Sequence, residues 1–279
     1  MFSIVIPTWN NLPFLQLCIR SIQQHSQHEH QIIVHINDGS DGSLAWVREN
    51  NLTHTHSPEN MGICQATNYA ASLAKHNYIV YLNDDMYCCP GWDRALSDTV
   101  NRLNTSLFML SGTMIEPRAT HNPCVIVGNY GESHADFAEK KLLTDINTFN
   151  KADWFGATWP PTLVHRDWWI KLGGYSSEFS PGMSSDNDLS MKFWHAGCRI
   201  FLGVGSSLVY HFQSKSTGKI KKNNGRQQFL NKWGITQSVF DQYYLRRGQP
   251  ANTLVLSEIE PSLATQWAHW RSAIKKRLT

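Results

Sequence analysis

YIVYLNDDMYCCPGW, residues 78–92, joins a strand-like run to two adjacent carboxylates. Tyr78–Leu82 has the aromatic, β-branched and leucine side chains that favour a buried strand. The run ends at Asn83, and two aspartates follow, Asp84 and Asp85. Neighbouring like charges repel each other, most strongly where water is excluded. The pair therefore indicates either a solvated turn that caps the next helix or a place where a cation lies against the chain.

Strand-like and helix-like segments alternate on both sides of this stretch. The strand patterns cover Ser3–Pro7, Gln31–Ile36, Thr53–His56, Tyr78–Leu82 and Leu107–Thr113. The helical patterns cover Leu12–Gln24, Ser43–Glu49, Ile63–Ala74 and Pro90–Leu103. Strands that alternate with helices are joined by right-handed crossovers into a parallel sheet. We therefore expect an α/β fold with a mainly parallel central sheet and helices on both faces.

The second half of the chain is less regular. Its patterns predict a strand within 124–127, a helix at Thr162–Leu172, a helix at Asp188–Ala196, and short strands at Arg199–Leu202 and Ser207–Tyr210. A glycine follows each of these two helices, as is common at helix C-termini. After residue 222 the pattern is mainly helical.

In parallel sheets of this kind, ligands bind beyond the carboxyl ends of the strands. No GxGxxG or GxxxxGK[ST] loop occurs at these ends, so backbone amides alone do not form a phosphate site. Carboxylates that face a phosphate need a divalent cation between them, and Mg²⁺ or Mn²⁺ fills that role. The aspartate pair predicts such a metal, with a helix N-cap before Pro90 as the alternative. Three polar strand ends would meet at this edge: Pro7-Thr8-Trp9-Asn10, Asn37-Asp38-Gly39-Ser40-Asp41-Gly42 and Asn83-Asp84-Asp85.

Composition narrows the class of protein. The 279 residues are 41% hydrophobic and 17% charged, which is typical of a globular chain with a large core. A net charge of +3 is too small for nucleic acid to be the main partner. The 11 tryptophans suit either the core or stacking on bases and sugars.

Targeting signals and cysteine pairs are both missing from the sequence pattern. The N-terminal MFSIVIPTWNN lacks the basic and apolar regions of a signal peptide, and no apolar run approaches the ~20 residues that span a bilayer. The six cysteines, at 18, 64, 88, 89, 124 and 198, form no CxxC pair and no zinc-like spacing with histidine. We expect reduced thiols and a cytoplasmic protein.

Seven stretches resemble, in this order, the motifs of the inverting glycosyltransferases of family 2. SIVIPTWN is similar to that family's first strand and base-binding turn, and INDGSDGS to its VDDGSxDGT. ENMGICQATNYA resembles NxGxxxAxN at Asn60, Gly62, Ala66 and Asn68, and LNDDMYCCPGW resembles the metal-binding strand end. The last three are LVHRDWWIKLGGYSSEF, SSDNDLSMKFWHAGCRI and VYHFQSKST, similar to the stretch ending GGFDExF, to EDxDLxxRxxxxGxRI, and to VYH with a downstream Ser or Thr.

The resemblance covers about residues 3–217 and implies the nucleotide-diphospho-sugar transferase fold called GT-A. It predicts a GT-A domain at 1–222, with a nucleotide-sugar half (1–114) and an acceptor half (115–222), and a helical C-terminal extension at 223–279. Two positions depart from the family pattern. Asn37 and Ser185 each stand where a carboxylate is common.

The resemblance also implies a reaction, the inverting transfer of a hexosyl or deoxyhexosyl group from a nucleoside-diphosphate sugar to a hydroxyl of a saccharide or lipid-linked acceptor. Asp186 would be the base that takes the acceptor's proton. Asp85 and His211 would hold Mn²⁺ or Mg²⁺ against the diphosphate. Trp154 and Asp188 would lie on the acceptor side. The donor would be bound by Pro7, Thr8, Trp9, Asp38, Asn60, Gly62, Asn68, Asn83 and Asp84.

Each of these roles has a structural alternative. Asp186 and Asp188 could be negative charges that complement a helix N-terminus. His211 could be a buried polar residue satisfied by the backbone, and Asp38 could close an Asx-turn. The two aromatic candidates could pack in the core: Trp9 and Trp154.

Two other functions share part of the pattern. A sugar nucleotidyltransferase normally carries a Gly-rich, basic loop after its first strand, whereas PTWNNLPFLQ has neither a glycine nor a basic residue. A non-catalytic module that binds a nucleotide sugar remains open because of Asn37 and Ser185.

Residues 261–279, PSLATQWAHWRSAIKKRLT, predict an amphipathic helix. Leu263, Trp267, Trp270 and Ile274 fall on one stripe at helical spacing. We expect the helix to pack on its own domain with a solvated basic face. The alternative is that the helix makes a peripheral contact with the inner face of an anionic membrane. The basic residues nearby are Arg271, Lys275, Lys276 and Arg277.

Overall fold

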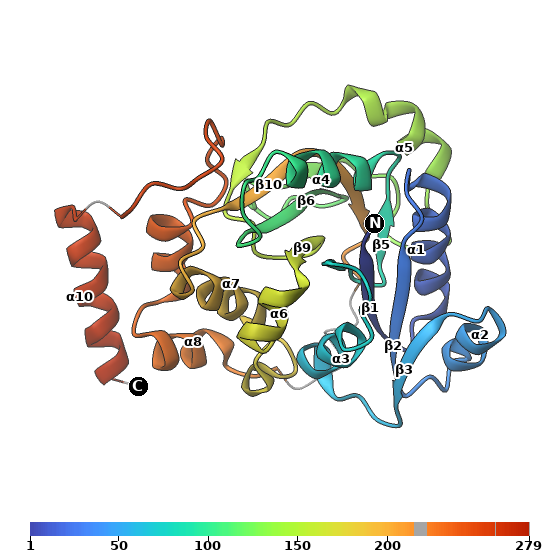
Figure 1. Cartoon of the computed structure of the whole chain (residues 1–279), viewed down its shortest axis with the longest axis horizontal. Helices are drawn as coiled ribbons and strands as arrows, with labels where there is room; N and C mark the ends of the chain where they lie inside the picture. The colour runs from blue at the N-terminus through green and yellow to red at the C-terminus, as the bar shows by residue number, and fades with distance from the viewer. Residues whose placement is uncertain (215–221, 260, 279) are drawn as a thin grey trace.

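One mixed sheet forms the centre of the molecule in the computed structural model, which describes residues 1–214, 222–259 and 261–278. The strand order is β3-β2-β1-β4-β9-β6-β10-β5, with β7 beside β6 and β8 beside β10. Figure 1 shows helices on both faces of this sheet, and α10 at the far edge from the first strands. The predicted fold class is confirmed.

The first half of the chain builds the parallel side of the sheet, as the alternation predicts. β1 pairs in parallel with β2 and β4, and β2 pairs in parallel with β3. The strands are β1 (Ser3–Trp9), β2 (Gln31–Asn37), β3 (Thr53–Ser57) and β4 (Tyr78–Tyr81). The helices are α1 (Leu12–His25), α2 (Ser43–Glu49), α3 (Gly62–Ala71) and α4 (Trp92–Asn101).

The second half adds both parallel and antiparallel strands. β10 runs parallel to β6 but antiparallel to β5 and β8. These strands are β5 (Met86–Cys88), β6 (Met109–Glu116), β7 (Ile126–Val127), β8 (Trp154–Phe155), β9 (Thr162–His165) and β10 (Phe201–His211). The helices are α5 (Glu139–Asp145), α6 (Arg166–Leu172), α7 (Ser185–His195), α8 (Gly225–Trp233), α9 (Gln237–Val239) and α10 (Leu263–Arg277).

The predicted helix at Thr162–Leu172 is wrong over its first four residues. They form β9, a central strand antiparallel to both β4 and β6. Leu163 and Val164 are buried in cores on opposite faces of the sheet, so the apolar run shows no two-residue alternation that would reveal a strand. The helix begins only at Arg166, where the His165 ring nitrogen accepts a hydrogen bond from the Asp167 amide.

Two further strand predictions need correction. The segments Arg199–Leu202 and Ser207–Tyr210 belong to one strand, β10, whose register with β6 shifts between Val204 and Leu208. The bulge interrupts the apolar pattern without ending the strand. The short β5 was not predicted, because its three residues follow the aspartate pair directly.

Side chains alternate between two cores on the faces of the sheet. From β1, Ile4 and Ile6 pack in one core with helices α1, α2 and α4, while Val5 packs in the other. The second core includes side chains of α3, α6, α7 and α8. All six cysteines are buried and unpaired, as expected.

The chain after residue 222 is helical only in part. Phe229 of α8 is buried in the second core, and residues 245–259 return along β8 without forming a helix. No helix within the described ranges combines the length and apolarity that a membrane crossing requires. The division of the chain at 222 stays a prediction.

Candidate functional site

A cavity of about 390 Å³ opens at the carboxyl ends of β1, β2 and β4. It lies where the parallel topology brings the polar strand ends together. The predicted residues that line it are Pro7, Thr8, Trp9, Asn60, Gly62, Asn83, Asp84, Asp85 and His211. Five lining residues were not predicted as ligands: Asn37, Ile63, Pro181, Gln213 and Ser214.

Asp84 and Asp85 bring two carboxylates to one side of this cavity. The Thr8 hydroxyl donates to Asp84 Oδ2 at 2.6 Å, and the Ser214 amide donates to Asp85 Oδ2 at 2.8 Å. Burial and the neighbouring charge of Asp85 raise the pKa of Asp84 well above its ordinary value. Of the two alternatives for the aspartate pair, a freely solvated turn does not fit, because both carboxylates line a cavity.

His211 completes this acidic corner from the end of β10. Its Nε2 lies 3.6 Å from Asp85 Oδ2, and its Nδ1 lies 3.0 Å from Glu116 Oε1 at the end of β6. Burial alone would lower the pKa of His211, but the charge of Asp85 and the hydrogen bond with Glu116 raise it. A carboxylate that holds Nδ1 fixes the ring and leaves Nε2 available for a ligand.

The donor set of this corner fits a divalent cation. Carboxylate oxygens suit Mg²⁺ and Mn²⁺, and an imidazole nitrogen is tolerated by Mn²⁺. Within the described part of the chain, no group of three or more His, Cys, Asp or Glu side chains is arranged to hold a metal ion. A cation bound at Asp85 and His211 would therefore need further ligands from a phosphate or water.

The opposite wall of the cavity is built by backbone and amides near α3. The Asn37 side chain donates to the Thr8 carbonyl and accepts from the Met61 amide, and the Asn60 side chain accepts from the Gly62 amide. Gly62 has φ +80°, and a Cβ there would lie 2.9 Å from Pro181 Cα. Asn37, where the family often has aspartate, thus ties β1 and β2 to the start of α3.

Asp38 and Trp9 differ in their position relative to the cavity. Trp9 lines the cavity and is partly exposed, whereas Asp38 is not among the lining residues. Asp38 Oδ1 accepts from the Ser40 amide at 3.1 Å, and Oδ2 accepts from Asn10 Nδ2 at 2.8 Å. The first contact is the Asx-turn that the sequence left open. A role of Asp38 in binding the nucleotide-sugar donor stays a prediction.

Asp186 begins α7 and is separate from the acidic corner. The Tyr175 hydroxyl donates to its Oδ1 at 2.6 Å. Burial raises the pKa of Asp186 to about 6, although this hydrogen bond acts in the opposite direction. The residue as a whole is of intermediate burial, and it is not among the residues that line the cavity.

An aromatic pair lies between Asp186 and the acidic corner. The rings of Tyr81 and Tyr175 meet edge to face with centroids 5.8 Å apart. The Tyr81 hydroxyl donates to Asn83 Oδ1 at 2.7 Å. Through these contacts and the Tyr175–Asp186 hydrogen bond, the pair connects the two regions, and burial together with the charge of Asp186 raises the pKa of Tyr81.

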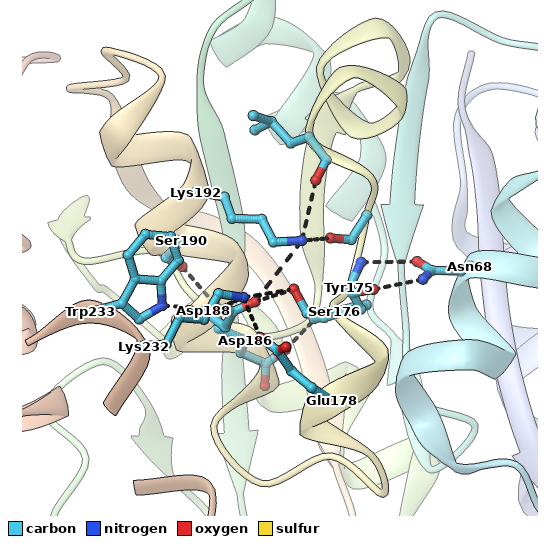
Figure 2. Close-up of polar contacts among 12 residues, drawn as sticks. Asn68, Tyr175, Ser176, Glu178, Asp186, Asp188, Ser190, Lys192, Lys232 and Trp233 are labelled. Carbon is cyan, nitrogen blue, oxygen red and sulfur yellow. Dashed lines mark hydrogen bonds and ion pairs between the residues drawn. The ribbon is translucent and has the colours of Figure 1, made fainter. Parts of the chain in front are cut away.

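Asn68 was predicted to bind the nucleotide-sugar donor, but in the structure its side-chain amide bonds to the backbone of Tyr175. Asn68 Oδ1 accepts from the Tyr175 amide at 2.9 Å, and Nδ2 donates to the Tyr175 carbonyl at 2.7 Å, as Figure 2 shows. Both groups of the side chain are used, and Asn68 is not among the lining residues. Gly174 has φ +55°, and a Cβ there would collide with Asn68 Oδ1. Asn68 therefore positions Tyr175, which holds Asp186.

Asp188 was predicted on the acceptor side, yet its side chain is fully buried. Its carboxylate accepts from Ser176 Oγ at 2.7 Å and from Trp233 Nε1 at 2.9 Å. Lys232 Nζ lies 2.8 Å and Lys192 Nζ 4.0 Å from its oxygens (Figure 2). A carboxylate with these partners has no free face for an acceptor, so Asp188 instead ties α8 and the turn after α6 to α7.

Trp154, the other predicted acceptor residue, is 2% exposed. Its Nε1 donates to Thr113 Oγ1 at 2.9 Å, and its ring lies directly over Gly203 of β10. The ring stacks with Trp159 at a centroid distance of 6.2 Å. Of the two roles that the sequence left open, the structure shows core packing.

Some site residues had a signal in the sequence that was not used. Glu116 ends β6, so the rule that ligand-binding side chains follow parallel strands would have found it. Tyr175 lies in the motif GGY, but its hydroxyl contact with Asp186 depends on tertiary structure. Residues 215–217 of the VYHFQSKST motif lie outside the described residues.

Comparisons with known proteins agree on one family and one fold. The family model described as glycosyl transferase family 2 matches residues 3–153. The structure of S. aureus TarS residues 1–349 has a TM-score of 0.52 at 13% identity, covering 76% of this chain and 58% of that one. The structure of GalNAc-T7 with UDP, GalNAc and Mn²⁺ has a TM-score of 0.60 at 14% identity, covering 87% and 50%.

A third solved structure, TarS 1–349 in complex with UDP-GlcNAc, has a TM-score of 0.57 at 12% identity, covering 83% of this chain and 64% of that one. The chain therefore spans less than two thirds of each of these structures. We found no relative among curated protein sequences. At such identities the structures show the GT-A fold alone. Because the family model covers more than half of the 279 residues, the chain belongs to glycosyl transferase family 2.

Proposed function

We propose that this chain transfers a sugar from a nucleoside-diphosphate sugar to a hydroxyl of a saccharide or lipid-linked acceptor, with inversion. One observation carries the proposal. The acidic corner of the cavity and the separate carboxylate of Asp186 flank the Tyr81–Tyr175 pair. An inverting transfer needs charge stabilisation at the leaving group and a base elsewhere at the site. The UDP and UDP-GlcNAc in the compared GalNAc-T7 and TarS structures support a nucleotide-sugar donor.

The donor would lie in the cavity, with its diphosphate at the acidic corner. Asp85, Asp84 and His211 Nε2 would hold Mn²⁺ or Mg²⁺ there. Bound in this corner, the cation would offset the negative charge that develops on the leaving diphosphate. Glu116 would keep the His211 ring in place through Nδ1. The Trp9 ring would stack on the nucleobase of the donor.

Asp186 would accept the proton of the acceptor hydroxyl. As that oxygen forms its bond to the anomeric carbon, the bond from this carbon to the diphosphate oxygen breaks, and the diphosphate leaves with the electron pair. A pKa of about 6 keeps the carboxylate mostly ionised at pH 7 while making it a better base than an exposed aspartate. Tyr175 occupies Oδ1, which leaves Oδ2 for the acceptor.

The two departures from the family pattern are compatible with this assignment. Asn37 makes structural contacts with the Thr8 carbonyl and the Met61 amide, which a neutral amide satisfies. The buried Ser185 hydroxyl donates to the Gly182 carbonyl at 2.8 Å, in the turn that precedes Asp186. A non-catalytic nucleotide-sugar-binding module is the second candidate, because neither contact by itself requires catalysis.

A thermal-shift screen followed by a turnover assay tests the proposal. We expect one nucleoside diphosphate to raise the melting temperature in Mn²⁺ but much less in EDTA. The matching nucleotide sugar should then be hydrolysed slowly, and faster once an acceptor is supplied. Binding without any turnover would favour the second candidate. No stabilisation by any nucleoside diphosphate would overturn both.

A further inference from the structure

Helix α10 docks on the rest of the molecule through small and polar side chains. Thr265 and Ser272 are its buried residues, and the Ser272 hydroxyl accepts from the Thr236 amide at 3.2 Å. The His269 ring stacks on Tyr244, with Nε2 3.1 Å from the tyrosine hydroxyl. The helix therefore packs on its own domain, as expected, but not through its apolar stripe.

The apolar stripe faces outward. The exposed fractions are 78% for Leu263, 60% for Trp267, 56% for Trp270, 37% for Ile274 and 80% for Leu278. At about 100° per residue, these side chains fall within an arc of about 80°, opposite the buried pair. They make up five of the eleven exposed large hydrophobic side chains in the described residues, and the others are scattered. A concentration of this kind marks an interaction surface.

The net positive charge of the chain comes from the same segment. Residues 261–279 contain four Lys and Arg and no Asp or Glu, whereas the rest of the chain has 21 Lys and Arg against 22 Asp and Glu. Arg271 and Arg277 fall about 60° to either side of the centre of the stripe. Both are exposed. The outward surface of α10 is thus an apolar band bordered by guanidinium groups.

We propose that this surface lies on an anionic membrane, with the stripe in the boundary between headgroups and acyl chains. Tryptophans suit that boundary, and arginines beside them attract anionic headgroups. A second copy of the chain is a poorer partner, because two facing stripes would bring together four guanidinium groups, those of Arg271 and Arg277 from each copy. The packed face lies opposite, so α10 can contact a bilayer without leaving its domain (Figure 1). This proposal is independent of the proposed reaction.

Vesicle co-sedimentation of the full chain tests it. We expect binding to vesicles of phosphatidylcholine with phosphatidylglycerol to exceed binding to phosphatidylcholine alone by roughly tenfold or more, and to fall at high salt. Trp267→Ser/Trp270→Ser should weaken binding by roughly tenfold or more. Its melting temperature should stay unchanged, because both rings are exposed. Arg271→Gln/Arg277→Gln should weaken binding to the anionic vesicles and reduce its dependence on salt.

Two matched variants serve as controls. Tyr69→Ser/Ile170→Ser removes exposed apolar side chains elsewhere, and Arg48→Gln/Arg94→Gln removes exposed positive charges elsewhere. Both should bind vesicles like the unmodified chain. The proposal is overturned if anionic vesicles are not preferred, or if the double tryptophan variant binds as well as the controls. Self-association that the tryptophan variant abolishes, without vesicle binding, would instead assign the stripe to a second copy.

Discussion

Two pairs of aspartates lie in different regions of the molecule, and they differ in the charged side chains that surround them. At the end of β4, Asp84 and Asp85 face one cavity, and among the described residues His211 forms an ion pair with Asp85 there. On α7, Asp188 is matched by two lysines, while the partner of the Asp186 side chain within the described ranges is a tyrosine hydroxyl. A buried carboxylate without a fixed countercharge is costly. The unmatched carboxylates are therefore the ones that point to binding or chemistry.

The largest effect should come from Asp186→Asn. The amide keeps the shape of the side chain but cannot accept the acceptor's proton, so we expect transfer to fall by roughly 10²-fold or more. Donor affinity, measured by calorimetry, should stay within about twofold. Asp167→Asn is the control, because that side chain is 75% exposed at the start of α6. Near-normal turnover in Asp186→Asn would show that another group is the base.

Asp188→Asn should change stability and not chemistry. Removing the charge leaves Lys192 and Lys232 without their buried partner, which should lower the free energy of unfolding by about 2–3 kcal/mol. Chemical denaturation measures this directly. Asp98→Asn, which breaks the exposed pair with Arg94, should cost about 0.5 kcal/mol or less. Equal losses in the two variants would contradict a stabilising role for the buried Asp188 carboxylate.

The sequence predicts the residues at the strand ends much better than it predicts the contacts of the α7 aspartates. The polar ends of β1, β2 and β4 were predictable, because parallel strands bring their carboxyl ends to one edge. The Asp188–Lys232 ion pair was not, because its two residues are 44 positions apart and no local pattern links them. The central position of β9 was missed for the same reason, since its pairing with β4 and β6 is non-local.

Asp85→Asn probes the other pair. Loss of one charged oxygen should weaken nucleoside diphosphate binding in Mn²⁺ by roughly tenfold and change binding in EDTA very little. Isothermal titration under both conditions provides the comparison. Asp98→Asn should leave both affinities unchanged. If Asp85→Asn bound the nucleotide in Mn²⁺ as tightly as the unmodified chain, the acidic corner would not be the metal site.

The smallest effect should come from Tyr175→Phe, which leaves Asp186 in place and removes one hydrogen bond to it. That bond favours the ionised carboxylate, so its loss should raise the pKa of Asp186 further above about 6. Because the base must be ionised, activity falls as the pH drops through this pKa. The acid limb of the profile of kcat/KM against pH should therefore move upward by roughly half a unit.

A purely structural role for Tyr175 would lower activity equally at every pH, so the position of the acid limb separates the two explanations. Tyr130→Phe is the matched control, because that buried tyrosine donates to Asp145 at 2.9 Å in another part of the fold. Its variant should keep the acid limb where it is. An unmoved limb in Tyr175→Phe would mean that the tyrosine does not tune Asp186, and that the contrast between the two α7 aspartates rests on countercharge alone.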